Sequence, residues 1–263
     1  MKFNHFHDCH MVTQSPWPFF LSVAITNLIL NLFMSMHTNF LNIKMLFALI
    51  NFFFIIFLWS RDIVRESTGQ GCHTLKVQKL IKFGMALFIL SEVMFFFSFF
   101  WAFFDYALNP SLEIGCMWPP KGVVPLNPMH VPLLNSLILV SSGLTITSAH
   151  MFLMNSNKSK AMMWTSLTVI LGIYFTILQI LEYKTTPFSF TDSAYGSIFF
   201  LTTGFHGFHV IIGTILILVS LVRMYMNHFS SKRHLNFEMA CWYWHFVDFV
   251  WLFLYISIYW WGY

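Results

Sequence analysis

Five ionisable side chains stand inside long apolar stretches of the sequence, where such groups are costly and by default functional. They are Glu92, His206, His209, His245 and Asp248. His206 and His209 are three positions apart, and His245 and Asp248 repeat that spacing, so each pair falls on one face of a helix. Imidazoles and carboxylates together are ligands of many transition-metal sites. We favour the simpler interpretation, in which neighbouring hydroxyls, carbonyls or a His–Asp contact between adjacent helices satisfy these groups, and we predict no metal.

Glu92 stands near the middle of the apolar segment LFILSEVMFFFSFFW. An ionised carboxylate at that depth costs about 2.5–3.5 kcal/mol on insertion scales. The side chain should therefore be neutral, hydrogen-bonded or close to water. Two interpretations remain open: a proton-responsive group beside a proton pathway, or a protonated carboxyl group that holds helices together.

A second set of polar residues lies at the ends of the apolar segments, all on one predicted side of the membrane. The set comprises the cationic or titratable residues Arg61, Arg65, His73, Arg223 and His228, with Trp59 and Glu66 close by. Cations and aromatic rings at headgroup depth are what an anionic phospholipid requires. The alternative is ordinary snorkelling of basic side chains toward water, and spacing alone favours it.

The composition places these residues in a membrane protein. Of the 263 residues, 57% are hydrophobic and 9% are charged, whereas soluble domains carry about 25% charged residues. The net charge of +4 is too small to indicate a nucleic-acid partner. The four cysteines, Cys9, Cys72, Cys116 and Cys241, form no CxxC pair, which argues against a disulfide framework or a thiolate metal site.

Seven segments are apolar enough to cross a bilayer, which requires about 20 residues each. They are residues 16–34, 45–59, 80–104, 131–154, 162–181, 196–222 and 239–261. The second segment is short. Polar or proline-rich connections are predicted at 61–74, 109–132, 155–160 and 227–238. We therefore predict one all-α integral membrane domain over residues 1–263, with seven transmembrane helices.

The distribution of lysine and arginine predicts the orientation. Eleven lie at the N-terminus and in the connections on its side: Lys2, Arg61, Arg65, Lys76, Lys79, Lys82, Lys158, Lys160, Arg223, Lys232 and Arg233. Three lie on the other side: Lys44, Lys121 and Lys184. The positive-inside rule then places the N-terminus inside and the C-terminus outside.

Several classes of membrane protein fit poorly. A seven-helix receptor normally has its N-terminus outside, and a retinal protein needs a lysine in its last span, which is absent here. The histidines within the spans are too few for two haems and a copper. An independent transporter or channel subunit with a His/Asp/Glu proton relay stays the alternative, although the two related halves common in transporters are not evident.

Five ordered phrases resemble subunit III of cytochrome c oxidase, of the mitochondrial type. They are WSRDIVRESTGQG, LFILSEVMFFFSFFWAFF, WPPKGVVPLNP, YGSIFFLTTGFHGFHVIIGT and FEMACWYWHFVDFVWLFLYISIYWWGY. The similarity runs from SPWPFF near the N-terminus to the final tyrosine, and the span count and orientation agree with that family.

The resemblance implies a specific architecture and role. Two helices and five helices would form a V-shaped cleft that holds phospholipids, in a protein of the mitochondrial inner membrane. Haem and copper would belong to subunits I and II, and this chain, without cofactors of its own, would pack on subunit I among further small subunits. The complex is a proton-translocating oxidoreductase that passes electrons from cytochrome c to oxygen. This chain would stabilise the catalytic subunit and support proton uptake.

The resemblance also implies roles for single residues. Glu92 matches the family's membrane-buried glutamate. Positions near the bound lipids are matched by Trp59, Arg65, Glu66, His73, Arg223 and His228. The sequence departs from the family at Ser60, where a second tryptophan is usual, and at Cys72 and Asp105.

Overall fold

A computed structural model describes residues 10, 12–38, 43–112 and 115–263 of the chain. Lys2 and Cys9 lie outside these residues. The elements in chain order are α1 (Trp17–Thr38), α2 (Ile43–Thr68), α3 (Leu75–Leu108), α4 (Val131–Met154), α5 (Lys158–Thr185), α6 (Ala194–Tyr225), α7 (Leu235–Leu254) and the π-helical η2 (Tyr255–Trp261). Seven helices, the last of them continuing through η2, are long and apolar enough to cross a membrane. The prediction of an all-α protein with seven membrane helices is confirmed.

Most helices extend beyond the predicted apolar spans, and the connections between them are shorter than predicted, whereas α4 has the predicted bounds 131–154. The largest difference is in α2, which continues to Thr68 through residues predicted as a loop. α7 likewise begins at Leu235, inside the predicted connection 227–238. Apolar length measures only the crossing of the hydrocarbon layer, whereas backbone hydrogen bonds continue a helix into the headgroup region, where polar side chains are tolerated.

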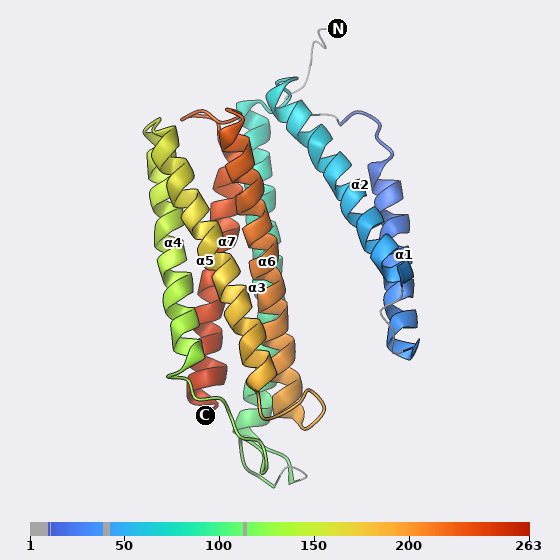
Figure 1. Ribbon diagram of the computed structural model, residues 1–263, viewed down its shortest axis with the longest axis vertical. Coiled ribbons are helices and arrows are strands. Elements are labelled where there is room, and N and C mark those ends of the chain that lie inside the picture. Colours follow the sequence, from blue (N-terminus) through green and yellow to red (C-terminus); the bar gives the residue numbers. More distant parts are fainter. Residues whose placement is uncertain (1–9, 11, 39–42, 113–114) are drawn as a thin grey trace. The chain divides into compact units, whose positions relative to one another are not determined.

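The chain forms two compact units, residues 1–81 and 82–263. In the first unit, α1 and α2 run side by side in opposite directions (Figure 1). Ala24 of α1 and Ala48 of α2 are almost completely buried, and small side chains let membrane helices approach closely. The indole of Trp17 donates a hydrogen bond to Asp62 Oδ2 at 2.7 Å, which ties the start of α1 to the end of α2.

The second unit contains most of α3 and all of α4–α7 (Figure 1). α5 packs against α4 and α6, and α7 packs against α4 and α6. The turn between α4 and α5 is short and contains Ser156 in a left-handed conformation, with φ of 59°. The Asn157 side chain caps α5 by accepting a hydrogen bond from the backbone N–H of Lys160.

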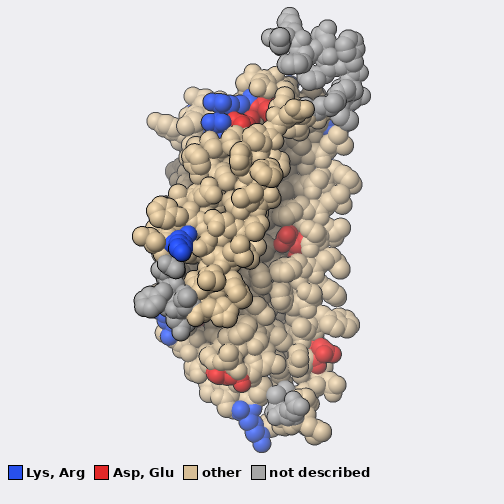
Figure 2. All heavy atoms as spheres, turned by 90° about the vertical axis from the view of Figure 1, so that its right-hand side faces the viewer, with Lys and Arg blue, Asp and Glu red and all other residues tan. Residues whose placement is uncertain are grey.

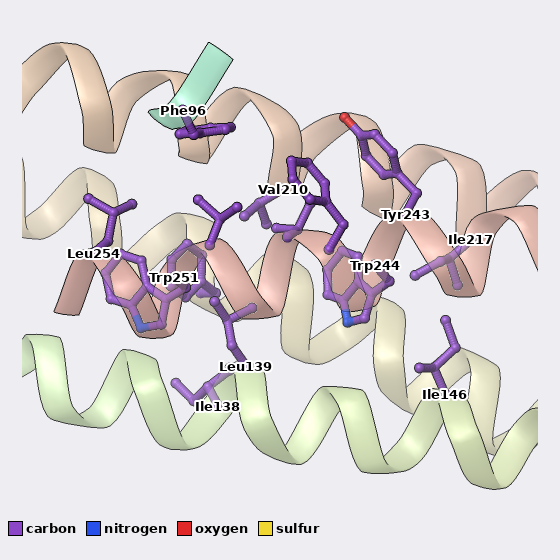
Figure 3. Close-up of a cluster of buried hydrophobic side chains, with 14 of the residues drawn as sticks. Phe96, Ile138, Leu139, Ile146, Val210, Ile217, Tyr243, Trp244, Trp251 and Leu254 are labelled. Carbon is purple, nitrogen blue, oxygen red and sulfur yellow. The ribbon is translucent and has the colours of Figure 1, made fainter. Parts of the chain in front are cut away.

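Two tryptophans of α7 form the centre of this second unit. The indole nitrogens of Trp244 and Trp251 face the ribbon of α4 (Figure 3). They donate hydrogen bonds to Ser142 Oγ at 2.9 Å and Ser136 Oγ at 3.0 Å. Both rings are fully buried. The two serines therefore satisfy N–H groups that would otherwise be buried without an acceptor.

The outer surface is largely apolar. On the face drawn in Figure 2, uncharged side chains cover most of the surface, and charged side chains are few. Large apolar residues such as Phe57, Leu144 and Phe249 are more than 60% exposed. A surface of this kind is compatible with lipid or with neighbouring membrane helices as its surroundings.

Candidate functional site

Glu92 of α3 and His209 of α6 form a hydrogen-bonded pair. His209 Nε2 lies 2.8 Å from Glu92 Oε2, and the other ring nitrogen, Nδ1, lies 2.6 Å from the Phe205 carbonyl oxygen of its own helix. The Glu92 side chain is 22% exposed, and that of His209 is 9% exposed. The sequence predicted that Glu92 would be neutral, hydrogen-bonded or close to water, and in the structure its carboxyl group is hydrogen-bonded to His209.

The backbone contact fixes where protons can be on this pair. A carbonyl oxygen only accepts hydrogen bonds, so His209 Nδ1 must carry a hydrogen. The contact between Nε2 and Glu92 then holds one further proton, either on the carboxyl group or on the imidazole. In both forms the pair is neutral as a whole, which suits its depth in the membrane. The two forms differ only in which partner carries the shared proton, and both keep the hydrogen bond between the two side chains.

Aromatic rings surround the imidazole of this pair. The ring centroid of Phe96 lies 5.1 Å from that of His209, edge to face, and Tyr243 stacks with it at 6.2 Å. Phe246 lies 6.3 Å away. These contacts shield the histidine from water on several sides and leave the carboxyl group as the more accessible partner.

His206 makes different contacts, although it shares the predicted helix face. It is 1% exposed, and its Nε2–H donates to the Val247 carbonyl at 3.2 Å. Its ring lies against Trp251, with a centroid distance of 5.2 Å. The structure thus joins His206 to the α7 backbone rather than to Glu92 or to an aspartate.

His245 and Asp248 are close to each other on α7 but do not form a short hydrogen bond. His245 Nδ1 lies 3.9 Å from Asp248 Oδ2. Asp248 Oδ1 is buried without a hydrogen-bond partner among the described residues. Gly143 of α4 leaves room for this carboxyl group, because a Cβ atom there would lie 2.7 Å from Asp248 Oδ2. The four polar residues of α6 and α7 therefore do not form one continuous chain of hydrogen bonds.

Within the described part of the chain, no group of three or more His, Cys, Asp or Glu residues is placed to hold a metal ion. The imidazoles of His206 and His209 instead bond to protein groups.

Four of the six residues proposed for lipid binding line one hollow in the first unit, which we call the rim pocket. They are Trp59, Arg65, Glu66 and His73. The rim pocket has a volume of about 780 Å³.

Further polar residues, which the sequence did not indicate, also line the rim pocket. His10 Nε2 lies 3.4 Å from Glu66 Oε2. Asp62 accepts from the indole of Trp17 and from the Arg61 guanidinium at 3.0 Å. Sequence reasoning missed Trp17 and Asp62 because their contact joins two helices and is 45 positions apart in the chain.

The remaining two proposed lipid residues belong to the second unit. The Arg223 guanidinium lies over the ring of Phe229, 4.8 Å from its centroid. The backbone N–H of His228 donates to the Arg223 carbonyl at 3.0 Å, so both residues lie at the C-terminal end of α6.

Comparison with known proteins gives consistent matches. The family model for cytochrome c oxidase subunit III matches residues 7–263. The chain is 54% identical over 259 residues to cytochrome c oxidase subunit 3 of Paracentrotus lividus, covering 98% of both chains. It is 53% identical to the protein of the same name from Struthio camelus, over 97% of this chain and 98% of that one. It is also 53% identical to that of Locusta migratoria, over 98% of both chains.

Proposed function

The chain belongs to the cytochrome c oxidase subunit III family, and we propose that it is a core subunit without redox centres in the respiratory oxidase of the mitochondrial inner membrane. The complex passes electrons from cytochrome c to oxygen and pumps protons. In this proposal subunits I and II hold the haem and copper groups, and this chain packs on subunit I. Purification of the chain from mitochondrial membranes tests this, since haem and copper should co-purify with it. An isolated chain that transports protons or solutes would instead support the transporter alternative.

The contact between Glu92 and His209 carries the proposed contribution to proton uptake. One proton is shared at a distance of 2.8 Å, in a pair that is partly exposed on the carboxyl side. Such a pair can hold a proton at membrane depth at no net charge. We therefore assign to it the role of keeping the proton entrance of the neighbouring catalytic subunit supplied during turnover.

Two substitutions of Glu92 separate this role from a structural one. Glu92→Gln keeps a hydrogen bond, because its amide N–H can donate to His209 Nε2, but it removes the transferable proton. Glu92→Ala removes both and leaves a buried polar atom unpaired, at a cost of about 1–3 kcal/mol. Ser91→Ala is the matched control, since the Ser91 hydroxyl is exposed and already bonds to the Phe88 carbonyl of its own helix.

We expect the purified complex with Glu92→Gln to keep normal stability but to lose activity after fewer turnovers and to pump protons less efficiently. The Ser91→Ala complex should behave as wild type in both assays. If Glu92→Gln leaves turnover lifetime and pumping unchanged, the proton role is wrong, and the assignment to the oxidase is unaffected.

The rim pocket supports the second part of the proposal, phospholipid binding. Arg65 of α2 and His73 of the connection between α2 and α3 line this pocket together with Trp59. The double change Arg65→Gln with His73→Gln should reduce the number of phospholipids retained per complex, measured by mass spectrometry. Lys121→Gln, in the connection between α3 and α4, is the control. Equal lipid retention in the two variants would contradict the proposal.

Orientation can be tested with two native cysteines. Cys72 lies between α2 and α3, and Cys116 lies between α3 and α4. With the N-terminus inside, the exposed Cys116 should react with a membrane-impermeant thiol reagent added to the outer face of intact inner membranes. Cys72 should react only after the membranes are opened. The reverse order would overturn the proposed orientation.

A further inference from the structure

His245 is an exposed imidazole within the apolar segment of α7. Its side chain is 47% exposed. It lies six residues after the start of the predicted apolar span 239–261, or about 9 Å along the helix axis at about 1.5 Å per residue. This depth is inside a hydrocarbon layer about 30 Å thick, although short of its middle.

The contacts of His245 within this chain are long. Nε2 lies 3.4 Å from Thr147 Oγ1, a hydroxyl that already donates to the Gly143 carbonyl at 2.7 Å. Nδ1 lies 3.9 Å from Asp248 Oδ2. Strong hydrogen bonds to nitrogen have lengths of about 2.7–3.2 Å. Both ring nitrogens thus retain capacity for a better partner.

Other exposed polar side chains of the membrane helices differ in this respect. The hydroxyls of Ser91, Ser98 and Thr176 bond to carbonyls of their own helices at 2.6–2.7 Å. The imidazole of His245 makes no such local bond among the described contacts. Acyl chains offer no hydrogen-bonding group, and a polar group without partners is costly in hydrocarbon.

The surface around His245 has the pattern of a helix-packing seam. We define it by Trp242, His245, Phe249 and Leu252 of α7, which are exposed, and by the exposed or half-exposed Leu137, Ser141, Leu144, Ser148 and Met151 of α4, the helix against which α7 packs. Both rows alternate in steps of three and four residues, so each row lies along one face of its helix. The two serines of α4 permit a close approach of another backbone. We call this surface the α4–α7 face.

We propose that a transmembrane helix of another subunit packs along the α4–α7 face and presents a hydroxyl, amide or carboxyl group to His245. This inference rests on the proposed function, which supplies the other subunits. The hydrogen-bonding capacity of the imidazole selects a polypeptide over lipid acyl chains.

Crosslinking in the purified oxidase complex tests the identity of the occupant. A photoreactive benzophenone maleimide is attached to Leu144→Cys on the α4–α7 face or to Ile173→Cys on α5 as the control. Leu144 and Ile173 are both exposed, at 68% and 50%. The wild-type complex gives the background from the native cysteines. We expect Leu144→Cys to form an adduct with another subunit and Ile173→Cys to react mainly with lipid.

Adducts only with lipid, or only with a second copy of this chain, would overturn the proposal. Co-purification of haem and copper with the same complex shows whether the proposed function still stands in that case.

A second experiment examines His245 itself. His245→Leu should release one particular subunit at a lower detergent concentration than wild type, and His245→Gln should restore much of its retention. Thr176→Val is the control, because the Thr176 hydroxyl is already bonded within its helix. If His245→Leu retains every subunit as wild type does, the proposed contact is wrong. If the His245→Leu variant does not assemble, the crosslinking from Leu144→Cys alone decides whether another subunit occupies the α4–α7 face.

Discussion

The fit of Trp244 between two glycines leads to a stability prediction that can be worked out in detail. A Cβ atom at Gly172 of α5 would lie 2.3 Å from Thr214 Cγ2 and 2.8 Å from Trp244 Cη2. Ordinary contacts of a Cβ atom have separations of 3.4–4 Å, so the neighbours would have to move by about 1 Å in a close-packed interior.

Overpacking of this kind costs about 1–3 kcal/mol. Alanine has a higher helix propensity than glycine, which stabilises the helix by up to about 1 kcal/mol and offsets part of this loss. For Gly172→Ala, where the overlap is severe, we expect a net loss of about 2 kcal/mol. Gly213→Ala on α6 should lose less, because the nearest atom to its Cβ would be Trp244 Cε3 at 2.8 Å. Gly207→Ala on α6 is the matched control, since nothing lies within 4 Å of its Cβ position.

The assay is thermal unfolding of the purified complex, in which the dissociation of this chain from the complex is measured as the temperature rises. We expect Gly207→Ala to melt at or above the wild-type temperature. Gly213→Ala should melt at a lower temperature, and Gly172→Ala at the lowest of the three. A double-mutant cycle identifies the cause. Trp244→Phe removes the ring atoms nearest to Gly213, so Gly213→Ala should have little further effect in that background. The reasoning is refuted if Gly172→Ala and Gly207→Ala melt at the same temperature. It is also refuted if Gly213→Ala lowers the stability equally in the wild-type and Trp244→Phe backgrounds.

Two further predictions concern polar contacts of the second unit. Ser142→Ala removes the acceptor of the Trp244 indole N–H, and leaving this buried donor unpaired should lower stability by about 1–3 kcal/mol in the same melting assay; an unchanged melting temperature would contradict this. Lys82→Met removes an ion pair with Glu238, at 2.6 Å, whose side chains are 36% and 21% exposed. We expect a loss below about 1 kcal/mol that shrinks as salt concentration rises, and a loss insensitive to salt would be inconsistent with an ion pair at this position.

The number and type of the membrane helices could be predicted from the sequence, because crossing a bilayer requires an apolar run of a minimum length. The helix ends could not. Arg61 and Arg65 lie within α2 although their polarity predicted a loop, because a polar helical turn outside the hydrocarbon is as stable as a loop there. The division into two compact units falls within α3, and the V-shaped cleft remains a prediction.

The candidate site was predictable only in part. The cost of a charge at membrane depth indicated that Glu92 would be neutral, hydrogen-bonded or close to water. Its partner could not be predicted, because His209 is 117 positions away and the contact depends on how α3 and α6 pack. The spacing of His206 and His209 placed them on one face. Residues three apart are nevertheless offset by about 60° around a helix axis. That offset directs His209 to α3 and His206 to the backbone of α7.

The central position of α7 has a consequence for biogenesis. Trp244 contacts α4 and both glycine-lined surfaces of α5 and α6, yet α7 leaves the ribosome after all three. Until α7 inserts, the surfaces of α4, α5 and α6 that contact Trp244 lack their partner. A premature stop codon before Trp242 would therefore delete the middle of the bundle rather than its periphery, and the incomplete product should be a substrate for membrane proteases.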